Sequence, residues 1–314
     1  MSDPQDKTGL PQDAAADAPT TTHRCGFAAL IGRPNVGKST LLNGLTGQKL
    51  SIVTPKPQTT RHRVLGLVNL PDAQIAFVDT PGLHRQEGRA LNRAMNRTAA
   101  AAALDADVII FVVEALRFGD EDGLALSRAV ESGRPIVAVV NKVDTVYPRE
   151  RLLPFLEQLG ARHNFAEVMP LSALDARDML RLQQVIVKHL PLSVALFPPE
   201  QLTDRSKSFR IAEIIREKLT LELNEELPYG IAVEVEAMGE DEGQLMVSAV
   251  IWVDRAGQKP IVIGARGERL KRVGTSARRE LNALLDQRLH LSLWVKVRED
   301  WADSALALRQ LGLE

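Results

Sequence analysis

Residues 32–39 read Gly-Arg-Pro-Asn-Val-Gly-Lys-Ser, a stretch that combines two glycines with a lysine and a hydroxyl side chain. The glycines let the backbone curl so that successive N–H groups point inward at phosphate oxygens. Lys38 would reach the β- and γ-phosphates of a nucleotide, and the Ser39 hydroxyl would bind Mg²⁺. The sequence therefore predicts a phosphate-binding loop made of Gly32, Asn35, Val36, Gly37, Lys38, Ser39 and Thr40.

Asp79 and Gly82 follow an apolar run that ends at Val78. An aspartate at the end of a strand would bind Mg²⁺ through water, and the Gly82 N–H would contact the γ-phosphate, so this backbone could register hydrolysis. A simple strand-end turn would have the same Pro-Gly composition. The preceding phosphate-binding loop favours the functional interpretation.

The polar segment 51–63 lies between these two motifs and contains adjacent threonines. A threonine here can complete the Mg²⁺ shell only while the γ-phosphate is present. We favour Thr60, which precedes Arg61, over Thr59, and a solvated threonine-rich loop is the alternative. The predicted metal ligands are Ser39, Thr60 and Asp79, and the predicted catalytic groups are Lys38, Thr60 and Gly82.

Residues 141–144, Asn-Lys-Val-Asp, follow another apolar run and suit recognition of a nucleobase. The Asp144 carboxylate can accept from both N1–H and the exocyclic amine of guanine, whereas adenine would leave it unpaired, a difference of about 10⁴-fold. Asn141 would tie this loop to the phosphate-binding loop, and the Lys142 stem would cover the base. The backbone N–H groups of Ser172 and Ala173 suit the guanine O6, so the sequence favours GTP over ATP.

Each motif must be placed by a strand that ends just before it. From residue 27 to about 190, apolar runs alternate with amphipathic ones, as in an α/β domain with a mostly parallel sheet covered by helices. Ligands then bind at the carboxyl ends of the strands. The predicted strands are Phe27–Ile31, Val64–Leu70, Gln74–Val78, Val108–Val113, Ile136–Val140 and Val168–Leu171. The predicted helices are Lys38–Thr46, Arg89–Leu104, Glu121–Glu131, Arg149–Arg162 and Ala176–His189.

A second pattern begins after a proline-containing linker. The order is helix, strand, strand, a Gly-X-X-Gly turn entered by a strand or a helix, then helix and strand. Trp252 and Trp294 lie in strand runs, which favours core packing, and the role of Trp301 is undecided. The predicted elements are the helix Arg205–Leu223, the strands Ile231–Glu236, Leu245–Val253 and Leu289–Val297, and the turn Gly264–Gly267.

The Gly-X-X-Gly turn would let an RNA backbone approach closely, with a phosphate at the following helix N-terminus. Residues 255–279 contain eight basic side chains and one acidic side chain, an excess that suits a phosphate backbone. An ordinary helix-entry turn is the alternative. The predicted RNA-binding residues are Gly264, Ala265, Arg266, Gly267, Lys259, Arg269, Lys271 and Arg272.

Composition sets outer bounds on this interpretation. The chain has 314 residues and a net charge of −1, so its overall charge does not favour binding to nucleic acid. Its one cysteine cannot form an internal disulfide, which fits a reducing cytosol. No apolar run approaches the roughly 20 residues of a membrane span. The predicted segments are a disordered acidic extension (1–24), a nucleotide-binding domain (25–190), a linker (191–203), an RNA-binding domain (204–300) and a C-terminal tail (301–314).

These motifs, in this order, resemble the Era-type GTPases of bacteria. The resemblance rests on residues 32–40, 58–63, 79–84 and 141–144 and on the C-terminal pattern, and it covers nearly the whole chain past residue 25. It implies a Ras-like P-loop GTPase domain with a mixed sheet, followed by an α+β type II KH domain. It also implies GTP/GDP and Mg²⁺ as ligands, and binding to the single-stranded 3′ region of 16S rRNA as a checkpoint in assembly of the small ribosomal subunit. A monomer in the cytoplasm, with peripheral contact to the inner membrane, is the corresponding expectation for the cell.

Leu83 occupies the position at which Ras-like GTPases carry a water-orienting glutamine. We therefore expect slow intrinsic hydrolysis, about 10⁻⁴–10⁻³ s⁻¹. Asn35 suggests a K⁺ ion near the phosphates, because related GTPases use this asparagine for that purpose. Arg61, Arg63 and Arg85 are interpreted as solvated charges rather than arginine fingers.

Leu83 leaves two functional alternatives open. In the first, the protein is an enzyme whose turnover times its release from RNA. In the second, it is a nucleotide-gated RNA-binding module in which hydrolysis is incidental. A membrane-remodelling GTPase is disfavoured, because the sequence has no amphipathic or spanning element for it.

Overall fold

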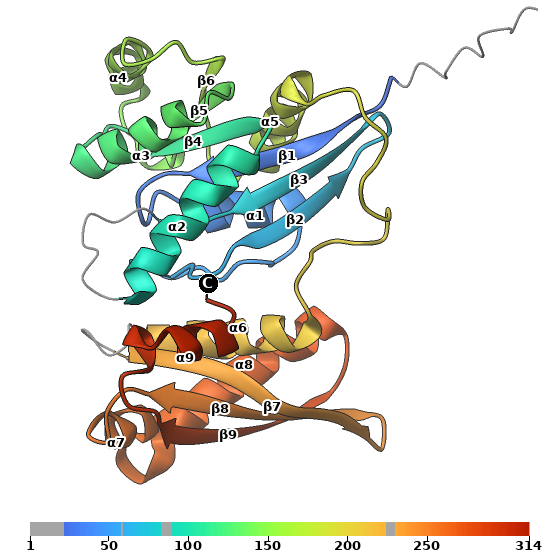
Figure 1. Cartoon of the computed structure of the whole chain (residues 1–314), viewed down its shortest axis with the longest axis vertical. Helices are drawn as coiled ribbons and strands as arrows, with labels where there is room; N and C mark the ends of the chain where they lie inside the picture. The colour runs from blue at the N-terminus through green and yellow to red at the C-terminus, as the bar shows by residue number, and fades with distance from the viewer. Residues whose placement is uncertain (1–21, 58, 83–89, 224–229, 314) are drawn as a thin grey trace, which may run out of the picture.

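The computed structural model describes residues 22–57, 59–82, 90–223 and 230–313. They form an N-terminal domain and a C-terminal domain, one above the other in Figure 1. Most of the predicted acidic extension lies outside these residues, but Arg24 already belongs to the first strand. Within the described ranges, no helix has the length and apolar composition needed to cross a bilayer.

A six-stranded sheet forms the centre of the N-terminal domain. Its strands are β1 (Arg24–Ile31), β2 (Val64–Asn69), β3 (Ala73–Asp79), β4 (Val108–Glu114), β5 (Ile136–Asn141) and β6 (Glu167–Pro170). The order is β2-β3-β1-β4-β5-β6, and β2 is antiparallel to β3 while the other neighbours are parallel, which confirms the predicted mixed sheet. Strands β3 and β5 are buried along their whole length because helices cover both faces.

Helices pack on both faces of this sheet (Figure 1). They are α1 (Lys38–Thr46), α2 (Ala90–Asp105), α3 (Asp120–Glu131), α4 (Leu152–Gly160) and α5 (Ala176–His189), with 3₁₀ helices at Val143–Thr145 and Arg149–Arg151. Helices α1 and α5 cover one face, and α2, α3 and α4 cover the other. The predicted helix 149–162 is interrupted because Pro154 fits only in the first turn of an α-helix, so α4 begins at Leu152.

A three-stranded sheet packed against two long helices forms the C-terminal domain. Its elements are α6 (Lys207–Glu222), β7 (Ile231–Asp241), β8 (Gln244–Val253), α7 (Gln258–Ile263), a 3₁₀ helix (Ala265–Gly267), α8 (Glu268–Leu285) and β9 (Leu289–Val297). Strand β7 is antiparallel and β9 parallel to the central β8. This is the predicted order, and the open choice before the Gly-X-X-Gly turn is resolved as helix α7.

The predicted linker, residues 191–203, runs along the N-terminal domain and is hydrogen-bonded to it. The backbone N–H of Cys25 in β1 donates to Pro191 O at 3.1 Å, and that of Leu67 in β2 donates to Leu202 O at 2.9 Å. These bonds fix the linker to two strands and so fix the point at which the C-terminal domain begins.

The region predicted as a C-terminal tail is folded between the domains. It consists of a 3₁₀ helix (Trp301–Asp303) and α9 (Ala305–Gln310), which lies at the domain boundary in Figure 1. Trp301 is fully buried, and its indole N–H donates to Gly230 O at 3.1 Å. The apolar cluster around it joins α2, β7 and the chain end, and includes Leu91, Met95, Ala232, Ala302, Ala307, Leu308 and Leu313.

The predicted core packing of Trp294 is wrong, because its side chain is 61% exposed on β9. The apolar stretch around it in the sequence suggested a buried position, but α6 and α8 cover only the opposite face of this sheet. Trp252 on β8 is half-buried, and its indole N–H donates to Glu234 at 2.9 Å.

Candidate functional site

The loop between β1 and α1 holds the residues predicted to bind phosphate, and close backbone packing requires its glycines. A Cβ atom at Gly32 would lie 2.3 Å from Val112 O. Gly37 has a φ of +101°, and a Cβ atom there would lie 2.3 Å from the Nδ2 atom of Asn141. The loop therefore lies directly against β4 and the end of β5.

Lys38 is buried inside this loop. Its Nζ donates to Gly32 O at 2.8 Å and to Arg33 O at 2.9 Å. Burial lowers the pKa of Lys38 to about 8, although the nearby Asp79 carboxylate favours the charged form. A desolvated ammonium group at this position favours binding of an anion such as a phosphate.

Ser39, Thr60 and Asp79 meet at one point, as predicted for the metal ligands. The Ser39 hydroxyl lies 2.7 Å from the Thr60 hydroxyl and donates to Asp79 Oδ2 at 2.8 Å. The Thr60 hydroxyl is 3.5 Å from the same carboxylate oxygen. Residues from α1, the segment 51–63 and β3 thus form a single cluster of oxygen atoms.

This cluster fits Mg²⁺. Asp79 is fully buried, and its Oδ1 atom has no hydrogen-bond partner among the described residues. Burial raises the pKa of Asp79, in spite of the opposing charge of Lys38 and the hydrogen bonds it accepts. A buried carboxylate with a spare oxygen and two neighbouring hydroxyls is an all-oxygen set, which Mg²⁺ prefers together with water and phosphate oxygens.

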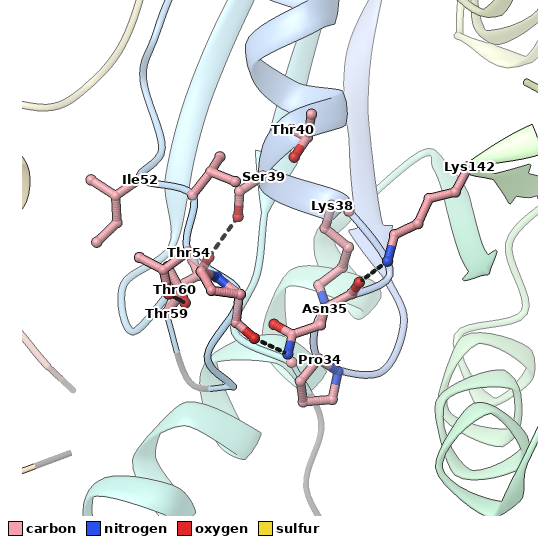
Figure 2. A pocket seen from close by; sticks show the side chains of 14 residues that line it. Pro34, Asn35, Lys38, Ser39, Thr40, Ile52, Thr54, Thr59, Thr60 and Lys142 are labelled. Carbon is pink, nitrogen blue, oxygen red and sulfur yellow. Dashed lines mark hydrogen bonds between the residues drawn. The ribbon is translucent and has the colours of Figure 1, made fainter. Parts of the chain in front are cut away.

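A pocket of about 350 Å³ opens beside this cluster, as Figure 2 shows. Gly82 lies at its edge, and a Cβ atom there would be 2.9 Å from the backbone N of Pro34, so the loop after β3 packs tightly on the phosphate-binding loop. The predicted site residues that line the pocket are Asn35, Gly37, Lys38, Ser39, Thr40, Thr60, Gly82 and Lys142.

Asn141 joins three loops, as its predicted role requires. Its Nδ2 donates to Val36 O at 2.8 Å, and its Oδ1 accepts from the Ala173 N–H at 3.0 Å. The Ser172 N–H donates to Asp178 at 2.9 Å. Both amides predicted to face the guanine O6 therefore have partners inside the protein, because buried N–H groups must be paired. They hold the shape of the loop, and their contact with guanine stays a prediction.

The residues of the Asn-Lys-Val-Asp motif extend to a second pocket of about 780 Å³. The Lys142 Nζ donates to Asn35 O at 2.8 Å, so its stem crosses between the phosphate-binding loop and the base-recognition loop (Figure 2). Asp144 is exposed and lines the second pocket with Ser172. Lys142 lines the phosphate-binding pocket, and the next two residues of the motif line the pocket that contains the predicted base reader.

The segment from Lys49 to Arg63, which carries Thr60, is held by the C-terminal domain. The predicted solvated state of Arg61 is wrong, because Arg61 is 3% exposed and its Nη1 donates to Ile231 O at 2.6 Å. Its guanidinium also lies 6.0 Å from the centre of the Trp301 ring. The sequence places Arg61 in a polar loop, and only the packing of the second domain buries it.

The Gly-X-X-Gly turn has the backbone of a close-approach site. Gly264, Arg266 and Gly267 have φ values of +76°, +50° and +79°. A Cβ atom at Gly264 would lie 2.7 Å from Arg269 Cβ, whereas one at Gly267 would meet nothing within 4 Å. The open side of Gly267 leaves room for a phosphate at the start of α8.

The predicted RNA-binding side chains divide into two sets. Lys259, Arg266 and Lys271 are exposed around the turn. Arg269 donates to Ile261 O, and Arg272 pairs with Glu222 of α6 at 3.0 Å. A ligand must compete with these partners to use the second set.

Sequence reasoning did not identify the charged residues of α6 that contact the segment 49–63. Arg216 and Glu217 are 3% and 2% exposed and lie among the apolar positions of this helix. Two adjacent charges within an apolar stripe are the signal that would have found them. Leu83 and Arg85, in contrast, lie outside the described residues.

His62 lies at the boundary between the domains. Its Nδ1–H donates to Gly312 O at 2.9 Å, and its ring meets that of Phe209 edge-on at 4.9 Å. Burial lowers the pKa of His62 to about 4, although the Glu213 carboxylate favours the charged form, and the charge of Arg216 lowers it further.

We expect this histidine to make the protein less stable in acid. Its pKa in the folded state is about 4, below its ordinary value of 6.5, so the unfolded state binds more protons between these two values. The free energy of unfolding should therefore fall as the pH decreases from 6.5 to 4, by at least about 1 kcal/mol from this residue. Denaturant unfolding at pH 5 and pH 7 should show a smaller loss for His62→Gln, and a wild-type loss for the exposed control His290→Gln. Equal losses in all three proteins would contradict the assignment.

Comparison with known families identifies both domains. The model of the 50S ribosome-binding GTPase family matches residues 27–142, and that of the KH domain matches residues 226–302. GTPase Era of Marinobacter nauticus is 49% identical over 290 residues, which are 92% of this chain and 95% of that protein. GTPase Era of Pseudomonas entomophila is 48% identical over 292 residues, which are 93% of this chain and 97% of that protein.

Two solved structures have the same arrangement over more than nine-tenths of this chain. An Era variant of Aquifex aeolicus bound to GDP·AlF₄⁻ superposes with a TM-score of 0.88 at 38% identity, over 92% of this chain and 99% of that one. Era in complex with MgGDPNP and nucleotides 1506–1542 of 16S ribosomal RNA superposes with a TM-score of 0.89 at 38% identity, over 93% and 99%.

Proposed function

We propose that this chain, which belongs to the Era family of GTPases, is a GTP-dependent switch. During assembly of the small ribosomal subunit, its KH domain would bind the 3′ region of 16S rRNA. Family membership supports GTP hydrolysis as its activity, and the Era complex with 16S rRNA nucleotides and MgGDPNP supports both ligands.

One observation supports the proposed switch most directly. The segment 49–63 supplies Thr60 to the oxygen cluster with Ser39 and Asp79, and the same segment is hydrogen-bonded to the KH domain through Arg61. A loop that contributes to the nucleotide site and to the domain interface can relate the state of the nucleotide to the position of the KH domain.

The side chains of this site divide the work of hydrolysis. When bound, Mg²⁺ supplies positive charge to the phosphate oxygens, and Ser39, Thr60 and Asp79 would hold it. Lys38 would bind the β- and γ-phosphates, and the Gly82 N–H would orient the γ-phosphate. Asn141 keeps the base-recognition loop against the phosphate-binding loop, and Asp144 would select guanine.

Single-turnover hydrolysis of GTP, with and without a 3′-terminal 16S rRNA fragment, tests this proposal. We expect slow hydrolysis that RNA accelerates, as in an enzyme whose GTP turnover determines when it is released from RNA. If RNA binds but leaves a very slow rate unchanged, the alternative is favoured, in which GTP acts as a ligand of an RNA-binding module and hydrolysis is incidental. Failure to bind either ligand would reject the proposal.

We also propose that K⁺ assists hydrolysis. Asn35 has a φ of +62°, and its Nδ2 donates to Pro55 O at 2.9 Å. An amide group and a backbone carbonyl, both sources of oxygen ligands, therefore meet beside the phosphate-binding loop (Figure 2). We expect a several-fold faster rate in K⁺ than in Na⁺ at equal ionic strength, and no such difference for Asn35→Ala. Equal wild-type rates in the two salts would contradict the proposal.

A cytoplasmic monomer that contacts the inner membrane peripherally completes the proposal, and this part rests on the family resemblance. Sedimentation equilibrium tests the oligomeric state, and cell fractionation with and without high salt tests the membrane contact. A stable dimer, or a protein absent from every membrane fraction at low salt, would contradict the corresponding part.

A further inference from the structure

Arg216 of helix α6 connects the KH domain to the loop that carries Thr60. Its side chain is buried, with 3% exposure, and Glu217 and Thr220 of the same helix are buried as well. The Nη2 atom donates to the backbone carbonyl of Thr59, the residue directly before Thr60. A charged group from the RNA-binding domain therefore holds the main chain next to a predicted Mg²⁺ ligand.

The guanidinium of Arg216 is itself fixed in place by Glu213, one turn earlier in α6. Nε and Nη2 donate to the two carboxylate oxygens of Glu213, both at 2.7 Å. Burial alone would raise the pKa of Glu213, but the charge of Arg216 and its hydrogen bonds hold that pKa below its ordinary value. A bidentate pair of this kind sets the orientation of the guanidinium plane as well as its position.

The other end of the same loop is held by the next residue of α6. Glu217 accepts from the Val53 N–H at 3.0 Å and from the Lys49 Nζ at 2.7 Å. Adjacent residues of one helix thus hold the start of the loop at Val53 and its end at Thr59. Thr60 follows directly, with its hydroxyl 2.7 Å from that of Ser39.

We propose that Arg216 is a positioning residue for GTP hydrolysis: by holding the Thr59 carbonyl, it fixes Thr60 at the nucleotide site and relates that position to the KH domain. This inference rests on the proposed GTPase function and adds the contact through which the KH domain acts on it. Arg216 contacts the loop and not the nucleotide, so its effect on the reaction passes through Thr60.

Helix α6 also reaches the predicted RNA-binding surface. Glu222, near its C-terminal end, pairs with Arg272 of α8 at 3.0 Å, and Arg272 lies five residues after the last glycine of the Gly-X-X-Gly turn. The two helices share one apolar core, so a change at Arg272 has a rigid connection to Arg216 through α6. An RNA phosphate that binds Arg272 competes with Glu222 for the guanidinium group. RNA binding can therefore affect α6 and, through Arg216, the segment 49–63.

Arg216→Met and Arg216→Lys, compared with the control Lys207→Met in the same helix, test the inference. Lys207 is exposed, and its Nζ donates to Gln287 Oε1 at 3.1 Å. It is the first residue of α6 and lies nine residues before Arg216. Arg216→Met removes the hydrogen bond to Thr59, and Arg216→Lys keeps one donor without the bidentate pair. Far-UV circular dichroism and thermal unfolding establish that each variant is folded, and if Arg216→Met does not fold, Arg216→Lys carries the test.

The first measurement is independent of activity. Hydrogen–deuterium exchange of the peptide that spans residues 49–63 is recorded with Mg²⁺ and GDPNP and with Mg²⁺ and GDP. We expect the wild type and Lys207→Met to gain protection with GDPNP, and Arg216→Met to lose most of that gain. A merely structural role would increase exchange equally in both nucleotide states, and unchanged protection in Arg216→Met would overturn the inference.

The second measurement separates binding from the chemical step. We expect the single-turnover rate of Arg216→Met to fall about 10- to 100-fold, because misplacing a positioning group by about 1 Å has an effect of that size. Its affinity for GDP should stay within about twofold, and Arg216→Lys should recover part of the rate. A wild-type rate in folded Arg216→Met would overturn the inference. A wild-type protein that neither hydrolyses GTP nor responds to RNA would instead reject the proposed function, and the exchange data would still decide the role of Arg216.

Discussion

Asp144→Asn should lose about 10⁴-fold in affinity for GTP and gain affinity for xanthosine triphosphate. The carboxylate accepts from two guanine donors, whereas an asparagine presents a donor to one of them and leaves it unpaired. Xanthine carries a carbonyl in place of the exocyclic amine, so the asparagine side chain matches it. Isothermal titration calorimetry with both nucleotides measures the two changes directly.

Asp175→Asn is the matched control for this experiment. Asp175 lines the same 780 Å³ pocket, but its side chain caps helix α5 by accepting from the Arg177 N–H at 2.9 Å. Asparagine caps a helix about as well as aspartate does. The control should therefore bind GTP within a few-fold of the wild type. If Asp144→Asn keeps its GTP affinity, or both variants lose it equally, Asp144 does not read the base.

Gly37→Ala is expected to lower GTP affinity by about 100-fold or more. Its φ of +101° strains any residue with a side chain, and the added Cβ would lie 2.3 Å from the Asn141 amide nitrogen. That nitrogen holds Val36 O, so relief of the clash separates the phosphate-binding loop from the base-recognition loop. The positive φ and the clash each cost about 1–3 kcal/mol. Together they are sufficient for this loss, since about 1.4 kcal/mol changes the affinity tenfold. Fluorescence titration with a labelled GTP analogue measures it.

Gly47→Ala, at the other end of α1, separates the clash from backbone strain alone. Gly47 also has a positive φ, +65°, but a Cβ atom there would meet nothing within 4 Å. This variant should lose about 1 kcal/mol of stability and keep its GTP affinity. Equal affinity losses in the two variants would mean that the close approach of Gly37 to Asn141 has no role of its own.

The nucleotide site was largely predictable from the sequence, because each of its motifs depends on local structure. Ser39 lies in the first turn of α1, Asp79 ends β3 and Asn141 ends β5, and parallel strands bring their carboxyl ends to one edge of the sheet. The helix Lys38–Thr46 was predicted with its observed ends for the same reason, since apolar spacing and flanking glycines are sequence properties.

Features that depend on contact between the domains were not predictable in this way. Arg61 is polar and lies in a polar segment, yet Ile231 and Trp301 bury it. Trp301 lies in the segment predicted as a C-terminal tail, and in space it packs against α2 of the other domain. Periodicity shows which face of an element is apolar, but it does not show which partner covers that face. Trp294 illustrates the converse, an apolar side chain that lies on the sheet face opposite α6 and α8 and stays 61% exposed.

The affinity of the whole chain for a 3′-terminal 16S rRNA fragment tests most directly whether the nucleotide site and the KH domain are coupled. It is measured at one fixed salt concentration with GDPNP, with GDP and without nucleotide. We expect RNA to bind more tightly with GDPNP and, by reciprocity, GDPNP to bind more tightly with RNA by the same factor. Arg216→Met should bind RNA with nearly equal affinity in the three states. Equal affinities of the wild type in all three states would contradict this coupling, because the KH domain and the nucleotide site would then act independently.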